Sequence, residues 1–386
     1  MADSAPLAGL RVLEVAQFAA GPFPALLLAD FGADVVKVEP PGGDGFRAWP
    51  PQVDSGDGEP YGMNFAALNR NKRSVVLDLK DAADRVRFLS LCAKADVLIE
   101  NNRPGAMDRL GLGFADVRAV QPGIVYCSVS GYGQTGPYAK RGAFDVAVQA
   151  MAGYMSVTGD AEGAPAKCGV PVGDFMAGVY AAFGVMVALQ EARKTGKARH
   201  VDCSMLGCLL QAASLQFGEL WGTGSPPRRL GSRHPRNAPY RAFEASDKSF
   251  VIAAGTDRLW RKVCDVVGRA ELEKDSRFAS VEQRAAHEPA LTALLQPLFK
   301  RRAAAQWLAA FESAGVPCAP VYDFSEVCDD VHVKEMGILC PITLPGGRSS
   351  LSVASPLGMT GYSFRVSRNP PRLGEHDKDV FEDWLG

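Results

Sequence analysis

The sequence predicts an α/β fold, with a Rossmann-like large domain built on a parallel sheet and a smaller α+β domain. Between residues 10 and 129, short apolar runs alternate with helix-length segments. Strands separated in this way pair in parallel through right-handed crossovers. Residues 222–239 are dense in Gly, Ser, Pro and Arg, which is typical of a linker or an exposed loop. A chain of 386 residues also exceeds one typical core, which favours more than one domain.

The large domain is expected to contain five strands joined by helices. Helical patterns occupy residues 22–31 and 82–95. A doubly wound sheet binds ligands at the carboxyl ends of its strands, so the loops after these strands should surround one crevice. The expected strands are residues 10–15, 34–38, 74–79, 97–99 and 124–129, and the expected crevice loops are residues 16–21, 39–43, 101–104 and 130–136.

The second region combines strands with helices and then returns to the first. Residues 240–254 alternate like strands, and helical patterns follow at 260–267, 290–299 and 303–314. The tail ends in a short helix that we interpret as a return to the large domain. The predicted large domain therefore spans residues 1–222, completed by 335–386, and residues 223–334 form the linker and the small domain.

Composition argues against several classes of function. The net charge is −1 and the pI is about 6.5, so neither nucleic acid nor an acidic membrane is an expected partner. Local basic runs such as residues 70–73 are interpreted as solvated faces, of which at most one meets a phosphate. The nine scattered cysteines contain no Cys-x-x-Cys pair and predict reduced thiols, with no metal site. The start has no basic segment followed by an apolar one, and no apolar stretch reaches about 18 residues, so we expect a cytoplasmic protein.

One segment imitates a dinucleotide-binding site. Residues 131–136 match the pattern Gly-x-Gly-x-x-Gly and follow an expected strand, but Pro137 and Gly142 interrupt the helix that should begin there. The unit at residues 10–39 does end in an acidic residue, yet its turn holds only Gly21. An NAD-dependent oxidoreductase therefore stays as a weak alternative.

Asp174 is the main candidate for chemistry. It ends the run Gly169-Val170-Pro171-Val172-Gly173-Asp174, and an expected apolar helix follows at residues 175–193. The positive end of a helix favours an ionised carboxylate. Spacing alone favours Asp174 as an N-cap, since Asp is a preferred capping residue. The alternative is a nucleophile, because carboxylates serve in covalent catalysis.

Several motifs resemble those of one family across nearly the whole chain. They include Asn69-Arg70-Asn71-Lys72-Arg73-Ser74 and the pair Gly173-Asp174. The chain resembles the class III CoA-transferases, a superfamily that contains formyl-CoA transferase, carnitine CoA-transferase and α-methylacyl-CoA racemase. The resemblance implies a homodimer of two chains threaded as interlocked rings, with CoA bound by the large domain. The other matching segments are residues 7–14, 21–22, 28–39, 100–105, 130–133 and 373–376.

The resemblance assigns the nucleophilic aspartate to Asp174. In the implied reaction, this carboxylate attacks an acyl-CoA and forms a mixed anhydride, and the released CoA thiolate then forms an aspartyl-CoA thioester. An incoming carboxylic acid reverses these steps. The partners are thus an acyl-CoA and a small carboxylic acid, and coenzyme A is a substrate and product rather than a bound cofactor.

Supporting residues are expected near this aspartate. The N–H groups of Gly133 and Gly173, and of the neighbouring Gly136 and Gly178, would approach the developing oxyanion, although Gly173 is equally explained by a turn. By resemblance, Ala19 occupies the position of the active-site glutamine of formyl-CoA transferase, with Gln17 two residues earlier.

Phe144 separates this chain from two branches of the superfamily. It occupies the position of a tyrosine in formyl-CoA transferase, whose glycine-rich flap is also missing, so a formyl or oxalate specialisation is disfavoured. In the racemases a histidine stands at this position, within a Gly-His-Asp segment. Phenylalanine cannot transfer a proton, which makes a 2-methylacyl-CoA racemase the second choice. A family member that binds CoA without catalysis is a further alternative, against which Asp174 argues.

Basic residues indicate the class of substrate. The side chains expected around the crevice carry more positive charge than the CoA phosphates need, and a surplus Arg could hold a second carboxylate. We therefore expect a small dicarboxylic acid as acceptor and succinyl-CoA as donor, although any one of these residues is as readily an ordinary surface charge. The expected CoA-binding residues are Lys37, Arg73, Asn101, Arg103 and Lys140, and the charge count also includes Arg47 and Arg141.

Overall fold

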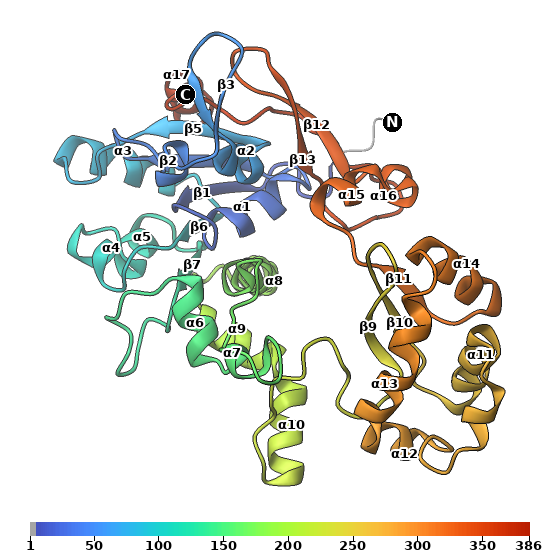
Figure 1. Cartoon of the computed structure of the whole chain (residues 1–386). Helices are drawn as coiled ribbons and strands as arrows, with labels where there is room; N and C mark the ends of the chain where they lie inside the picture. Colours follow the sequence, from blue (N-terminus) through green and yellow to red (C-terminus); the bar gives the residue numbers. More distant parts are fainter. Residues whose placement is uncertain (1–4) are drawn as a thin grey trace. The chain divides into compact units, whose positions relative to one another are not determined.

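The computed structural model describes residues 5–386, which form two compact units (Figure 1). Unit 1 contains the chain up to Tyr154, then Cys168–Ser225 and Val331–Gly386. Unit 2 contains Met155–Lys167 and Pro226–Asp330. The chain thus leaves unit 1 and returns to it, and the short segment Met155–Lys167 also joins unit 2.

Unit 1 is built on a six-stranded sheet in which every pairing is parallel. The prediction of an α/β fold with a parallel sheet is confirmed. All five expected strands are present, and β8 is a sixth that the sequence did not indicate. The strand order reverses at β1, which lies between β2 and β6. In order across the sheet, the strands are β5 (Lys72–Val76), β2 (Asp34–Glu39), β1 (Arg11–Val15), β6 (Val97–Glu100), β7 (Val125–Ser130) and β8 (Arg199–Ser204).

Successive side chains along each strand point to opposite faces of the sheet, and both faces are covered by buried apolar clusters. On β1, Val12 belongs to one buried apolar cluster and Leu13 to another. The cluster of Val12 is completed by α1 (Pro22–Ala29), α6 (Asp145–Met151), α8 (Val172–Thr195) and α9 (Met205–Ala212). The cluster of Leu13 is completed by α3 (Ala82–Cys92), α5 (Phe114–Val120) and α17 (Asp377–Leu385).

The helix α8 begins three residues earlier than expected. Its N-cap is Pro171, and it ends at Thr195 with Gly196, which has a φ of 65°, as its C-cap. Asp174 therefore lies within the first turn, so the interpretation of Asp174 as an N-cap is wrong. By length and hydropathy, α8 is the one helix between residues 5 and 386 that could cross a membrane, but its small residues pack against the sheet.

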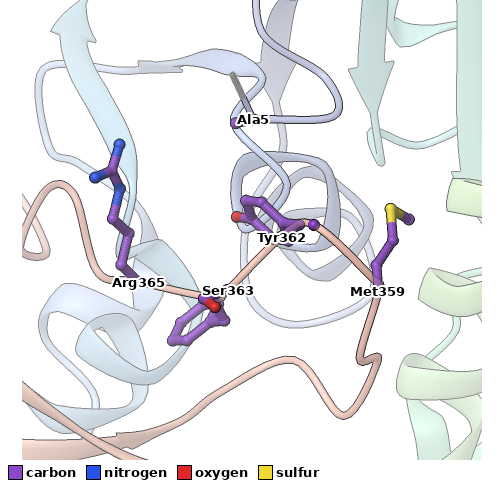
Figure 2. A pocket seen from close by; sticks show the side chains of 7 residues that line it. Ala5, Met359, Tyr362, Ser363 and Arg365 are labelled. Atoms are coloured by element: carbon purple, nitrogen blue, oxygen red, sulfur yellow. The ribbon is translucent and has the colours of Figure 1, made fainter. Parts of the chain in front are cut away.

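The C-terminal segment Val331–Gly386 belongs to unit 1. The Tyr362 hydroxyl donates to the carbonyl of Asp30, and its ring lies against Phe31. This segment lines a surface pocket together with Ala5 (Figure 2). The remaining elements of unit 1 are η1 (Gly45–Arg47), β3 (Gln52–Asp54), β4 (Pro60–Gly62), α2 (Met63–Asn69), α4 (Ala106–Arg109), α10 (Ser214–Thr223), α16 (Val331–Glu335), β12 (Leu339–Thr343) and β13 (Ser349–Val353), and α7 (Tyr154–Val157) starts at its boundary.

The basic run at residues 70–73 is not a solvated face. Arg70 is buried and pairs with Asp30, and Lys72 is buried beside Glu14. Arg73 pairs with Asp34 and Asp383. The expectation failed because the matching acids come from distant parts of the sequence. Strand β5 begins at Lys72, where its pairing with β2 begins, rather than at the expected Ser74.

Unit 2 is a small α+β unit, as predicted. Three antiparallel strands in the order β11-β10-β9 pack against helices around a core rich in Phe and Trp. Its elements are β9 (Tyr240–Glu244), β10 (Ser249–Ala253), α11 (Asp257–Val267), η2 (Ala270–Lys274), α12 (Val281–Ala286), α13 (Glu288–Phe299), α14 (Ala304–Ala314), β11 (Cys318–Pro320) and α15 (Phe324–Asp329).

Candidate active site

A pocket of about 260 Å³ in unit 1 contains Asp174. It lies at the carboxyl ends of β1, β6 and β7, next to the point where the strand order reverses, which is where such sheets bind ligands. The expected loops after these three strands contribute to it, but the loop after β2 does not. The lining residues are Phe18, Ala19, Ala20, Asn101, Asn102, Arg103, Pro104, Val129, Ser130, Gly131, Arg141, Gly142, Ala143, Phe144, Asp174 and Met205.

Asp174 has an unusually high pKa for a carboxyl group. Burial, and to a lesser extent the nearby carboxylate of Asp145, together raise this pKa from its ordinary value of 3.8 to about 7. The helix end was expected to favour the ionised form, so this expectation is wrong. Desolvation and a second negative charge outweigh the helix end, and Asp174 changes its charge near neutral pH.

Asp145 holds the start of α8. Its Oδ1 accepts the N–H of Gly173 at 2.8 Å, and its Oδ2 accepts from Gln149 at 2.7 Å. Gln149 is fully buried and in turn accepts the N–H of Cys168 at 2.8 Å. A side chain at Gly173 would place its Cβ 3.0 Å from the Asp145 oxygen, so glycine permits this close approach. Asp145 therefore fixes the residue that precedes Asp174.

The glycines considered for an oxyanion site have other contacts. The N–H of Gly133 donates to Ser130 Oγ at 3.0 Å, as the N–H of Gly173 does to Asp145. A Cβ at Gly178 would lie 2.6 Å from the ring of Phe23, so this glycine allows α8 to pack against α1. The N–H groups of Gly133 and Gly173 are thus already engaged in hydrogen bonds.

Two of the three supporting side chains line the pocket. Ala19 is buried in its wall, and Phe144 is exposed over 70% of its surface. Gln17 is not part of the lining, since its Oε1 faces the N–H of Gly45 at 3.4 Å. The neighbouring Phe18 lines the pocket instead, and sequence reasoning missed it.

The five expected CoA-binding residues do not lie together. Asn101 and Arg103 line the pocket, and Lys140 is exposed beside the lining residue Arg141. Lys37 is fully buried, with its Nζ 2.7 Å from Glu14 Oε1 and 2.8 Å from Asp44 Oδ2. Arg73 is buried as well and does not line the pocket.

The count of free positive charges near the pocket is smaller than expected. Arg47 pairs with Glu39, and Arg73 is matched by two acids. Within residues 5–386, Arg103, Lys140 and Arg141 form no ion pair, and Arg141 lies over the ring of Tyr138. Three cations therefore remain for phosphate or carboxylate groups.

The glycine pattern after β7 does not begin a helix. The N–H of Gln134 donates to Asp202 at 2.9 Å, and the next helix starts only at Asp145. A dinucleotide site of the usual kind needs a helix to begin within the glycine pattern. This geometry argues against the NAD-dependent alternative.

Comparison with known proteins gives one consistent family. Residues 7–377 match the model of CoA-transferase family III. The chain is 42% identical to acetyl-CoA:oxalate CoA-transferase from Acetobacter aceti, covering 96% of this chain and 93% of the relative. It is 36% identical to succinate–glutarate CoA-transferase from Agrobacterium fabrum, covering 98% and 95%. The crystal structure of a CAIB/BAIF family protein from Brucella suis superposes with a TM-score of 0.90 at 36% identity, covering 99% and 100%.

Proposed function

The chain belongs to CoA-transferase family III and is an enzyme of that family, and from this premise we propose that it moves CoA from an acyl-CoA to a small dicarboxylic acid through covalent chemistry at Asp174. The relatives named above act on succinate, glutarate and oxalate, all of them dicarboxylic acids. We take succinyl-CoA as the first donor to test. Oxalate belongs in the test as well, although Ala19 and Phe144 differ from formyl-CoA transferase.

One observation carries the proposal: Asp174 is a partly buried carboxylate in a pocket, with no cation paired to it within residues 5–386. Removal of water strengthens a carboxylate as a nucleophile and protects an anhydride from hydrolysis. A pKa of about 7 leaves a large fraction of Asp174 ionised at neutral pH. A surface aspartate would be ionised too, but it would stay hydrated and weakly nucleophilic.

The chemistry then follows in balanced steps. An oxygen of Asp174 attacks the thioester carbonyl, the carbon–sulfur bond breaks, and CoA leaves as the thiolate. The thiolate attacks the side-chain carbonyl of Asp174, which releases the first acid and leaves CoA on the enzyme as a thioester. The carboxylate of the second acid attacks this thioester and forms a new anhydride, and the thiolate then takes the new acyl group and frees Asp174.

The three unpaired cations divide between the two substrates. Arg103 and Arg141 line the pocket, and Lys140 is exposed next to it. We assign them to the phosphates of CoA and to the distal carboxylate of the acid, which an arginine binds in bidentate fashion. Asn101 contributes to the same wall.

We also propose that the protein is a homodimer. On α8, Val179, Phe183 and Val187 follow one another at every fourth position and are exposed over 48%, 66% and 54% of their surfaces. A stripe of this kind on a long helix marks an interface. The resemblance names a second copy of this chain as the occupant. Sedimentation at nanomolar concentration should find dimers only, and a folded monomer would contradict the proposal.

The function is tested by mixing the protein with succinyl-CoA or acetyl-CoA and a panel of two- to six-carbon acids, and identifying new CoA esters by mass. We expect transfer to at least one dicarboxylic acid. The matched control is Asp174→Asn, which keeps the size of the side chain but removes the nucleophile. Hydrolysis of the donor without any new ester, across the panel, would contradict a transferase.

A further inference from the structure

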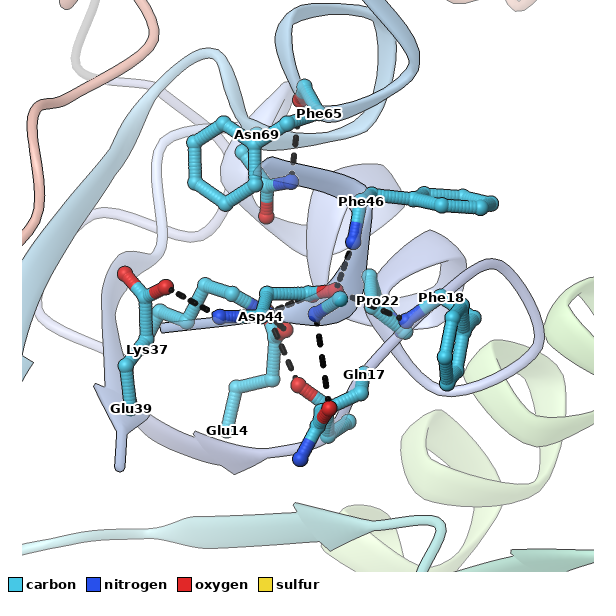
Figure 3. Close-up of polar contacts among 12 residues, drawn as sticks. Glu14, Gln17, Phe18, Pro22, Lys37, Glu39, Asp44, Phe46, Phe65 and Asn69 are labelled. Carbon is cyan, nitrogen blue, oxygen red and sulfur yellow. Dashed lines mark hydrogen bonds and ion pairs between the residues drawn. The ribbon is translucent and has the colours of Figure 1, made fainter. Parts of the chain in front are cut away.

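A buried cluster of charges lies next to the loop that lines the pocket (Figure 3). At its centre, Lys37 Nζ contacts Glu14 Oε1, Asp44 Oδ2 and the carbonyl of Ala16 at 2.7, 2.8 and 2.8 Å. The side chains of all three charged residues are fully buried. Burial works against the charge on Lys37, but Glu14, Asp44 and Glu39 together raise its pKa above the ordinary value. Lys37 therefore remains a cation and keeps Asp44 in place.

The other oxygen of Asp44 reaches the backbone of two aromatic residues. Its Oδ1 accepts the N–H of Phe18 at 3.1 Å and the N–H of Phe46 at 2.9 Å. The two rings touch each other, with centroids 5.4 Å apart. One carboxylate thus joins the buried cluster to two side chains, of which Phe18 lines the pocket that contains Asp174.

Phe18 needs this support because of its backbone conformation. Its φ is 64°, in the left-handed region that residues with a side chain rarely adopt. The neighbouring Gln17 is held by Asn101, which accepts its N–H at 2.9 Å and donates to its carbonyl at 2.8 Å. Gly45 leaves room for the Phe18 ring, since a Cβ at position 45 would lie 2.7 Å from that ring. Released from these contacts, the loop would relax towards an ordinary conformation.

We infer that Asp44, anchored by Lys37, is a positioning residue that holds Phe18 in the pocket wall and so sets the length of acid that fits against Asp174. The inference rests on the proposed function for the acid, but the hydrogen bonds on which it depends can be measured without any substrate. Asp44 itself does not line the pocket, so its effect passes through Phe18. Lys37, which was expected to bind CoA, is instead paired with Glu14 and Asp44.

The first test measures hydrogen exchange at the amides of Phe18 and Phe46 in the wild type, Asp44→Ala and Asp44→Asn. We expect strong protection in the wild type and about tenfold faster exchange in the alanine variant, because the acceptor is lost. The asparagine variant keeps an acceptor of the same shape but leaves Lys37 with one partner fewer, so we expect a smaller change in the same direction. The control is Asp30→Asn, which alters an equally buried ion pair elsewhere and should leave both amides protected.

The second test follows the acids. In Asp44→Ala, kcat/KM for the preferred acid should fall about ten- to hundredfold, mostly through a higher KM. The differences in kcat/KM among four- to six-carbon acids should become smaller. Phe18→Ala should reduce the differences in kcat/KM among these acids in the same way, and Asp30→Asn should leave them unchanged. Should the alanine variant fail to fold, Asp44→Asn decides: unchanged amide protection and unchanged preference overturn the inference. Absence of transfer in the wild type would overturn the proposed function, while the exchange experiment would still judge the role of Asp44.

Discussion

Two acids in unit 1, the buried Glu39 and the partly buried Asp174, differ in the charge of the group beside them. Glu39 lies at the end of β2, where burial raises its pKa, but the hydrogen bond from Arg47 and the charges of Lys37 and Arg47 lower it below its ordinary value in total. Asp174 lies at the start of α8, where burial and Asp145 both raise its pKa, to about 7. The difference lies in the partner: one carboxylate has a cation and the other has a second carboxylate.

This difference separates a structural acid from a reactive one. A carboxylate in contact with a guanidinium is stabilised as an anion and loses nucleophilicity. Asp174 has no such partner within residues 5–386, which is the property that its proposed role as a nucleophile requires. On the proposed function, paired acids such as Glu39 stabilise the fold, and the acid without a cation, Asp174, serves the reaction. The predictions that follow test each side of this comparison.

The largest effect is expected from Asp174→Ala. Transfer should fall by about 10³-fold or more, because no other carboxylate can form the intermediate. The fold should be retained, since the change removes an acid that burial disfavours. Steady-state rates together with circular dichroism check both parts. Activity near that of the wild type in the folded variant would refute the role of Asp174.

Breaking a buried ion pair should lower the stability of the fold. Arg70→Met leaves Asp30 buried without its cation, and the free energy of unfolding should fall by about 3–5 kcal/mol. Denaturant unfolding at one fixed protein concentration measures this loss. The control replaces both partners, Arg70→Met with Asp30→Leu, and should cost much less because no unpaired charge remains. A loss below about 1 kcal/mol in the single variant would contradict the buried pair.

The pH dependence follows from the pKa of Asp174. Because the ionised form is the proposed nucleophile, kcat/KM should rise about tenfold per pH unit below neutrality and level off above about pH 7. Asp145→Asn removes a like charge and should move the midpoint to lower pH. Burial also raises the pKa of Glu100 to about 7, so Glu100→Gln serves as the control and should leave the midpoint unchanged.

The same pKa fixes the sign of a stability effect. The folded-state pKa exceeds the ordinary value of 3.8, so folding favours the protonated form, and the carboxyl group costs stability increasingly as pH rises from about 4 to 7. Asp174→Asn should therefore be more stable than the wild type above pH 7 and equal to it near pH 4. Thermal unfolding at the two pH values tests this, and equal stability at both would show that Asp174 has an ordinary pKa.

The smallest effect is expected for exchange of the α-carbon proton of an acyl-CoA with solvent. Phe144 stands in the pocket wall where the racemases have a histidine, and its ring cannot transfer a proton. Incubation of a 2-methylacyl-CoA in deuterated water should give no deuterium at the α-carbon. Phe144→His should not create a good racemase, because the partner base would be unplaced. Deuterium incorporation at the rate of turnover, without CoA exchange between acids, would reverse the assignment.

The sequence predicted those features that local patterns determine. Apolar alternation located five of the six strands of the sheet, and the motif resemblance led to Asp174. The burial of Arg70 and Lys72 could not be predicted, because their acids Asp30 and Glu14 lie about 40 or more residues away in the sequence. Burial of charge depends on such distant partners, and no local pattern reports them.

Phe18 in the pocket, and Asp44 and Asp145 behind it, were missed for the same reason. Phe18 and Asp44 are joined by a hydrogen bond across 26 positions of the sequence. Asp145 reaches Gly173 across 28 positions of the sequence. The left-handed backbone of Phe18 has no signal in the sequence, since it is imposed by neighbours.

The most direct test of the account is to trap the enzyme with acyl-CoA alone, before any acid is added. Hydroxylamine or borohydride should react with the aspartyl-CoA thioester, and mass analysis of the peptides should find the modification at Asp174 in the wild type. The modification should be absent in Asp174→Asn and should weaken below about pH 7, as the carboxylate gains its proton. Modification of another residue, or full turnover without any modified aspartate, would contradict covalent catalysis at the unpaired acid.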